Sequence, residues 1–168
     1  MKYPNLEKLV DIIAVLRSEN GCEWDREQTH KSLRPNMLEE AYEAVDAIDE
    51  GDISNLREEL GDVLLQVVLH AQIAKDDGEF DIEDVAKELS DKLIHRHPHV
   101  FGNTEVHSTQ EILDNWDKLK KEEKTYRKSV LDGISKSQSA LMSAQKISKK
   151  VVKVGFEWDC VDSLKNCI

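Results

Sequence analysis

Residues 63–69 are Val-Leu-Leu-Gln-Val-Val-Leu, an apolar run that follows directly on the acidic segment 58–62. A helix over 63–74 would be apolar nearly all the way round, so it must be buried on most of its sides. Glycine and proline are scarce, at 7 and 3 residues, whereas a chain of short strands needs turn residues about every 8–12 positions. We therefore predict an all-α fold, a helical bundle.

Apolar residues recurring at three- and four-residue steps predict the individual helices. The expected helices cover about residues 5–18, 37–50, 54–75, 82–95, 108–128 and 137–154. Ser54 and Asp81 are the expected N-caps of the third and fourth helices. Residues 21–36 show no clear period and are interpreted as a long ordered loop, a kind of segment that often carries function.

The second expected helix is strongly acidic and has no base between residues 37 and 50. Its acids are Glu39, Glu40, Glu43, Asp46, Asp49 and Glu50. Like charges one turn apart cost a helix roughly 0.2–0.5 kcal/mol per pair, so these acids require a neutralising partner. The helical wheel puts an apolar arc beside them, which we expect to face the core: Leu38, Ala41, Tyr42, Val45 and Ile48.

A second acidic segment, residues 58–62, opens the third expected helix. Glu59 and Asp62 lie one turn apart, as do Glu40 and Glu43, so an antiparallel helix pair can bring these four carboxylates together. Oxygen-only ligands suit Mg²⁺, with Mn²⁺ as a second possibility, better than zinc. The alternative is that these acids form ion pairs with lysines and arginines from elsewhere in the chain.

The charge distribution argues against nucleic acid as a direct partner. The formal net charge is −11, and residues 1–100 hold 24 acids against 11 bases, whereas phosphate-backbone binding needs clustered Lys and Arg. The three cysteines show no CxxC spacing, which favours reduced thiols and a cytoplasmic location. No apolar run is long enough for a signal-peptide core or a membrane span.

One short segment recurs in the chain. Gly21-Cys22-Glu23-Trp24-Asp25 returns 134 residues later as Gly155-Phe156-Glu157-Trp158-Asp159. We predict one domain over residues 1–128, followed in 129–168 by a helical linker and the truncated start of a second copy. Chance similarity is the alternative, because only five positions are involved.

The two acidic segments, taken with three further ones, closely resemble the MazG family of nucleoside triphosphate pyrophosphohydrolases over essentially the whole chain. The signature stands here as Glu39-Glu40-Ala41-Tyr42-Glu43 and Glu58-Glu59-Leu60-Gly61-Asp62. The further matches are residues 20–29, residues 92–101, and Trp116 with Lys120.

This resemblance implies an Mg²⁺-dependent enzyme that hydrolyses an NTP or dNTP to the nucleoside monophosphate and pyrophosphate, cleaning the nucleotide pool. It implies that Glu40, Glu43, Glu59 and Asp62 are metal ligands. It implies that Glu39 either supports these ligands without binding the metal or orients the attacking water, with Glu58 as a weaker candidate. It further implies nucleotide contacts, made by Lys92, Arg96, Trp116 and Lys120. For Trp116 a place in the core is an equal alternative.

The resemblance also implies a homodimer, which we expect to form through the apolar third helix. Related proteins often carry two tandem copies of the domain, and the second copy can be the main catalyst. The alternative function is therefore a non-catalytic nucleotide-binding or dimerisation module of a two-domain MazG protein. A bare helical scaffold is a third reading, and it predicts no response to metal.

Overall fold

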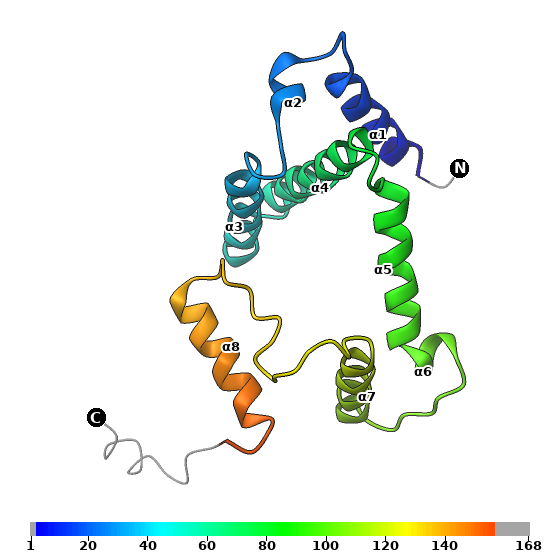
Figure 1. Ribbon diagram of the computed structural model, residues 1–168, viewed down its shortest axis with the longest axis vertical. Coiled ribbons are helices and arrows are strands. Elements are labelled where there is room, and N and C mark those ends of the chain that lie inside the picture. Colours follow the sequence, from blue (N-terminus) through cyan, green and yellow to red (C-terminus); the bar gives the residue numbers. More distant parts are fainter. Residues whose placement is uncertain (1–2, 157–168) are drawn as a thin grey trace. The chain divides into compact units, whose positions relative to one another are not determined.

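A computed structural model describes residues 3–156 of the 168-residue chain. All regular structure in that range is helical, as predicted (Figure 1). The helices are α1 Pro4–Arg17, α2 Glu23–Glu27, α3 Arg34–Glu50, α4 Ile53–Asp76, α5 Ile82–Arg96, α6 Pro98–Phe101, α7 Thr109–Glu122 and α8 Ala140–Val152. The chain divides into two compact units at residues 93 and 94, within α5.

The main helices match the predicted ones, and the differences lie at their ends. The N-cap of α4 is Asp52 rather than Ser54, because the Asp52 carboxylate accepts hydrogen bonds from the backbone N–H groups of Ser54 and Asn55. Asp81 caps α5 as predicted, accepting from the N–H groups of Glu83 and Asp84. The fifth helix, α7, ends at Glu122, short of residue 128.

The predicted loop 21–36 contains a short helix, α2, and ends where α3 begins. Arg17 fastens this segment from α1. Its side chain is 8% exposed, and it donates to Asp76 Oδ2 at 2.7 Å and to the carbonyl oxygen of Asp25 at 2.5 Å. A third hydrogen bond reaches the carbonyl oxygen of Gln28 at 3.3 Å. One guanidinium therefore joins α1, the 21–36 segment and the end of α4.

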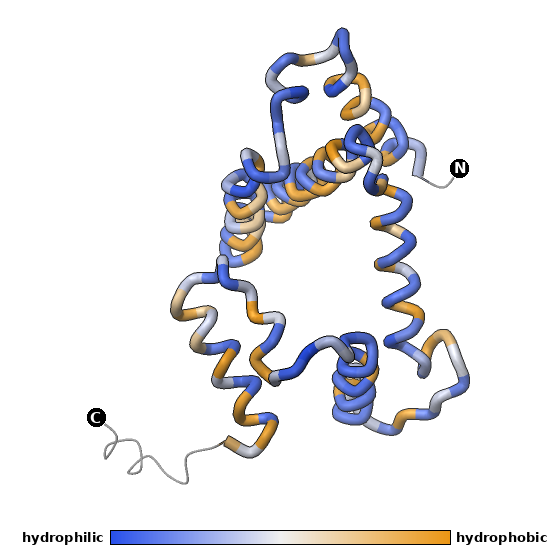
Figure 2. Tube along the Cα trace, in the orientation of Figure 1, coloured by the Kyte–Doolittle hydropathy of each residue, from blue (hydrophilic) through white to orange (hydrophobic). Residues whose placement is uncertain are grey.

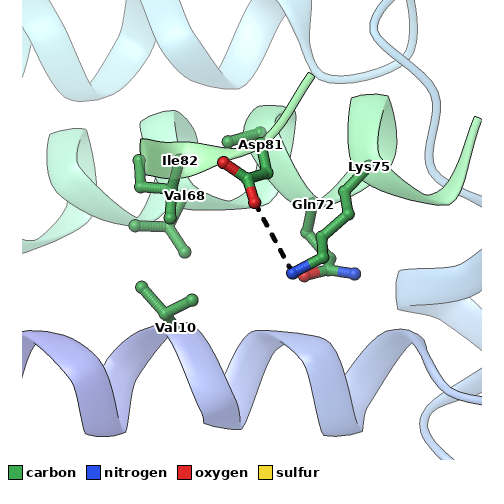
Figure 3. Close-up of a pocket in the computed structure, with 7 residues that line it drawn as sticks. Val10, Val68, Gln72, Lys75, Asp81 and Ile82 are labelled. Carbon is green, nitrogen blue, oxygen red and sulfur yellow. Dashed lines mark ion pairs between the residues drawn. The ribbon is translucent and has the colours of Figure 1, made fainter. Parts of the chain in front are cut away.

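The core of the first unit lies where α1 and the loop before α3 meet α4. Its buried residues are Ile13, Leu33, Val68, Leu69 and Ile73. Beside it, the start of α5 packs near α1 and α4 around a small depression, which Val10, Val68 and Ile82 help to line and which Lys75 and Asp81 bridge with a 3.8 Å ion pair (Figure 3). The depression has room for about one water molecule.

The helices α3 and α4 form an antiparallel hairpin and lie side by side (Figure 1). Gly51 allows the sharp turn between them, since its φ of +72° is in the left-handed region. Ala44 and Ala47 are the buried residues of α3. Their small side chains permit the two helices to approach closely, and this contact sets the register that places the acidic segments opposite each other.

The prediction for the apolar arc of α3 was wrong. Leu38, Tyr42, Val45 and Ile48 are 48–59% exposed. Orange bands in Figure 2 mark the apolar residues along the α3–α4 pair. The burial expected for residues 63–74 is largely confirmed, since six of them are buried and Leu64, at 37%, is the exposed one. Leu60, one turn earlier on α4, is 54% exposed. The hairpin thus packs on the core with one side and presents an apolar surface on another, which we call the α3–α4 apolar surface.

The second unit is described from residue 94 to residue 156. Ser108 caps α7 by accepting from the N–H of Glu111. Lys150 on α8 donates to the carbonyl oxygens of Val130 and Asp132 at 2.7 and 2.9 Å, which fixes the 129–133 segment to that helix. No helix in the described range is both long and apolar enough to cross a membrane.

Candidate metal centre and nucleotide-binding residues

The α3–α4 hairpin brings three of the predicted metal ligands together. Glu40 and Glu43 on α3 and Glu59 on α4 each offer a carboxylate oxygen, and these oxygens lie within 4.8 Å of one another. Glu40 and Glu59 are half-buried, and Glu43 is exposed. We call these three residues the carboxylate cluster.

Asp62 borders the carboxylate cluster. It lies one turn after Glu59 on α4, and its charge contributes to the raised pKa of both Glu40 and Glu59. Glu39 is exposed on α3 and stands outside the cluster, with a smaller effect on the pKa of Glu40. The helix pairing therefore assembles the carboxylates predicted from the two acidic segments and leaves Glu39 at their edge.

The acids of the cluster repel one another, and a cation could neutralise them. Partial burial and the charges of Asp62 and Glu43 raise the pKa of Glu40, and partial burial and the charges of Glu43 and Asp62 raise that of Glu59. Within the described residues, neither these groups nor Asp62 forms an ion pair with a lysine or arginine. Within residues 3–156, lysines and arginines therefore do not neutralise these acids through ion pairs, which was the alternative to a metal site.

The donor set fits the metal predicted from the sequence. All donors are carboxylate oxygens, the ligands that the hard cations Mg²⁺ and Mn²⁺ prefer. Two helices joined by a two-residue turn supply them, so rigid elements hold these carboxylates close together. Sulfur and imidazole ligands are absent from the cluster.

The predicted nucleotide-binding residues lie in both units. Lys92 is half-buried on α5, in the first unit with the carboxylate cluster. Arg96, Trp116 and Lys120 belong to the second unit, where they come together. The Arg96 Cζ atom lies 5.4 Å from the centre of the Trp116 ring, and the Lys120 Nζ atom lies 4.6 Å from it. Both contacts are cation–π interactions.

Sequence reasoning missed the partner of Arg96. Arg96 is buried, with 8% exposure, and its Nε donates to Glu123 Oε1 at 2.9 Å, while its Nη2 donates to Glu123 Oε2. This pairing raises the pKa of Arg96 and lowers the pKa of Glu123. The spacing held a signal, because residues 116, 120 and 123 follow at i, i+4 and i+7 and so share one helix face.

A histidine pair was also missed. Nδ1 of His30, in the loop before α3, lies 2.7 Å from Nδ1 of His70 on α4, and the two rings stack with their centres 5.0 Å apart. Partial burial and the neighbouring His30 lower the pKa of His70. No sequence signal pointed to this contact, since His30 stands in a segment without periodicity.

Fold and site together define an all-α protein with a carboxylate site built on a helical hairpin. Residues 28–101, which contain both acidic segments, match the family described as the MazG nucleotide pyrophosphohydrolase domain. A solved structure, the MazG-related protein from Thermotoga maritima, aligns with a TM-score of 0.58 and 31% identity over 68% of this chain and 98% of that one. The chain belongs to the MazG family.

Longer relatives are more similar still. The nucleoside triphosphate pyrophosphohydrolase/pyrophosphatase MazG of Thermotoga maritima is 50% identical over 153 residues, 90% of this chain and 58% of that protein. The nucleoside triphosphate pyrophosphohydrolase of Escherichia coli is 47% identical over 156 residues, 91% of this chain and 59% of that protein. The chain thus spans somewhat more than half the length of these relatives.

Proposed function

We propose that this chain is an Mg²⁺-dependent nucleoside triphosphate pyrophosphohydrolase, which cleaves an NTP or dNTP to the monophosphate and pyrophosphate and so cleans the nucleotide pool. The observation that carries the proposal is the carboxylate cluster, three acids from two helices with no basic partner in the described range. The names of the relatives from Thermotoga maritima and Escherichia coli support it.

Each acid has a role in this proposal. Glu40, Glu43, Glu59 and Asp62 hold the metal, and Mn²⁺ is the natural substitute for Mg²⁺ in such a site. The acids alone would repel the phosphate groups of the nucleotide. A bound cation supplies the positive charge that attracts the phosphate oxygens. Glu39 is exposed beside the cluster, where its carboxylate can orient a water and accept its proton during attack on the α-phosphorus.

In the same proposal, the cationic residues bind the phosphate groups of the nucleotide. Lys92, Arg96 and Lys120 bind the phosphate chain, because guanidinium and ammonium groups form charge-assisted hydrogen bonds with phosphate oxygens. Trp116 is half-buried and carries two of these cations against its ring. It therefore contributes to the nucleotide site through them.

The domain division is also a proposal. We assign residues 1–128 to the MazG-like domain and residues 129–168 to a helical linker with the start of a second repeat. In support, α1 ends at Arg17, four residues before Gly21, and α8 ends at Val152, three residues before Gly155. Glu157, Trp158 and Asp159, the rest of the repeated motif, lie outside the described residues.

We further propose a homodimer formed through the α3–α4 apolar surface. Leu38, Tyr42 and Val45 follow at i, i+4 and i+7, so they form one stripe that a second copy can cover. Val45→Glu should convert the dimer to a monomer in sedimentation-velocity ultracentrifugation. The control is Val15→Glu on α1, an equally drastic change at another exposed valine. A dimer that survives Val45→Glu unchanged would exclude this surface.

We propose a cytoplasmic location, where free nucleoside triphosphates occur. The thiol of Cys22 is unpaired, which is compatible with a reducing compartment.

The activity is tested by incubating the purified chain with a panel of NTPs and dNTPs, with Mg²⁺ and with a chelator. The proposal expects metal-dependent release of monophosphate and pyrophosphate in equal amounts. Release of orthophosphate and a diphosphate instead would assign attack at a different phosphorus. A folded dimer that binds NTP and releases neither product would favour the alternative, a non-catalytic binding or dimerisation module.

A further inference from the structure

Arg96 is a buried cation with a single carboxylate partner in the described range. It is 8% exposed at the end of α5, and its ion pair with Glu123 joins that end to the residue after α7. A buried charge without a partner is strongly unfavourable, so Arg96 depends on Glu123 for its place. His95 adds only a distant contact, its Nε2 lying 3.9 Å from Glu123 Oε1.

The ion pair with Glu123 uses the Nε and Nη2 atoms of Arg96 and leaves Nη1 without a hydrogen bond to Glu123. Glu123 accepts from Nε and Nη2 of Arg96, whereas Nη1 donates to no protein atom of residues 3–156. The guanidinium also lies over Trp116. Glu123 and Trp116 therefore both restrain the guanidinium and limit the directions in which its free Nη1 end can point.

Lys120 makes the surroundings electropositive. Its ammonium lies 4.6 Å from the centre of the same Trp116 ring. Partial burial and the charges of Lys124 and Arg96 lower its pKa, with Asp117 acting in the opposite direction. Two cations therefore lie against one aromatic ring, and of these two only Arg96 forms an ion pair with Glu123 within the described residues. A phosphate group is an anion that both cations can bind.

We propose that Glu123 is a positioning residue, which holds Arg96 against Trp116 so that the free end of its guanidinium, together with Lys120, receives a phosphate group of the nucleotide. This inference rests on the proposed function. It assigns Glu123 no contact with the substrate, and it treats the ion pair as a device that orients Arg96 before binding.

A purely structural ion pair between α5 and α7 is the competing explanation, and the two differ in what they predict. A structural pair affects thermal stability and leaves phosphate binding by the folded protein unchanged. A positioning pair affects binding only through Arg96, so its effect must vanish once Arg96 is removed. The effect of removing Glu123 must also be equal for nucleotides with different bases, because all of them carry the same phosphate groups.

The test is a double-mutant cycle with Glu123→Ala, Arg96→Ala and the double variant, measured with ATP, CTP and inorganic tripolyphosphate in the presence of Mg²⁺. For Glu123→Ala we expect kcat/KM to fall about tenfold, mainly through KM, and the Kd for tripolyphosphate to rise by a similar factor. Adding Glu123→Ala to Arg96→Ala should change neither value. The control Glu122→Ala removes the preceding, exposed glutamate and should match the wild type.

Glu123→Gln keeps one acceptor for Arg96 and removes the charge. Its kcat/KM and its Kd for tripolyphosphate should lie between those of the wild type and those of Glu123→Ala. It replaces Glu123→Ala if that variant does not fold. A lower Tm with tripolyphosphate affinity and kcat/KM within about twofold of wild type would overturn the proposal. So would an undiminished effect in the Arg96→Ala background. If the wild type releases no pyrophosphate but binds tripolyphosphate in a Glu123-dependent way, the proposed function fails and the positioning role stands.

Discussion

Glu43 on α3 and Glu59 on α4 place carboxylate oxygens within 4.8 Å of each other across the turn at Gly51 and Asp52. Partial burial and the charge of Glu43 raise the pKa of Glu59. The hairpin imposes this proximity through the close packing at Ala44 and Ala47. The fold therefore maintains a repulsive arrangement, which the proposed cation would relieve.

Glu43→Gln should therefore stabilise the metal-free protein and abolish stabilisation by the metal. We expect its Tm in EDTA to rise by about one or two degrees, because one like charge is removed from the cluster. We also expect the upward shift of Tm with Mg²⁺ to be largely lost. Differential scanning calorimetry measures both. Asp49→Asn makes the same charge change on the same helix outside the cluster, and an Mg²⁺ response of Glu43→Gln as large as that of this control would contradict the prediction.

Arg17→Ala should be strongly destabilising. Removing the guanidinium leaves the Asp76 carboxylate and the carbonyl oxygens of Asp25 and Gln28 without their donor, and we expect a loss of about 2–3 kcal/mol in urea unfolding. Arg17→Lys should recover less than half of it, since an ammonium cannot reproduce the guanidinium fork.

Arg57→Ala, at an exposed position of α4, is the control for Arg17 and should stay within about 0.5 kcal/mol of wild type. An Arg17→Ala variant as stable as Arg57→Ala would show that the 21–36 segment is held by other contacts.

The His30–His70 pair should make stability depend on pH. The pKa of His70 is below its ordinary value of 6.5 in the folded state, so near and below that pH the unfolded chain binds a proton that the folded chain does not. The contribution of His70 is therefore present above pH 6.5 and is lost as the pH falls below it. Urea unfolding at pH 8 and pH 5.5 should show a smaller loss for His70→Phe than for wild type.

His107→Gln serves as the control for His70, because His107 is an exposed histidine of the second unit. It should lose as much stability as the wild type over the same pH interval. Equal losses in wild type, His70→Phe and His107→Gln would remove the histidine pair as a source of the pH dependence.

The helices and the carboxylate cluster could be predicted from the sequence because both follow from local periodicity. The spacing of Glu40 and Glu43 on one helix, and of Glu59 and Asp62 on the next, requires only an antiparallel pairing to bring the acids together. Cap positions were less certain, because Asp52 and Ser54 both have side chains suited to capping and the sequence does not choose between them. In the structure Asp52 is the N-cap of α4.

The apolar arc of α3 shows where such reasoning stops. Periodicity identifies Leu38, Tyr42 and Val45 as one stripe, but it cannot tell whether the chain's own core or another surface covers it. In the structure the two alanines, Ala44 and Ala47, face α4 instead. Glu123 was missed for a different reason. Its spacing from Trp116 and Lys120 places it on their helix face, but its partner Arg96 lies 27 residues away in the sequence.

The central claim is that the carboxylate cluster performs metal-dependent pyrophosphohydrolysis, and turnover by Glu59→Gln tests it most directly. The variant keeps the size of the side chain and removes one proposed metal ligand, and Asp49→Asn is the matched control. We predict that pyrophosphate release with Mg²⁺ falls at least a hundredfold in Glu59→Gln, with unchanged circular dichroism, and stays near wild type in Asp49→Asn. Undiminished release by a folded Glu59→Gln protein would contradict the account.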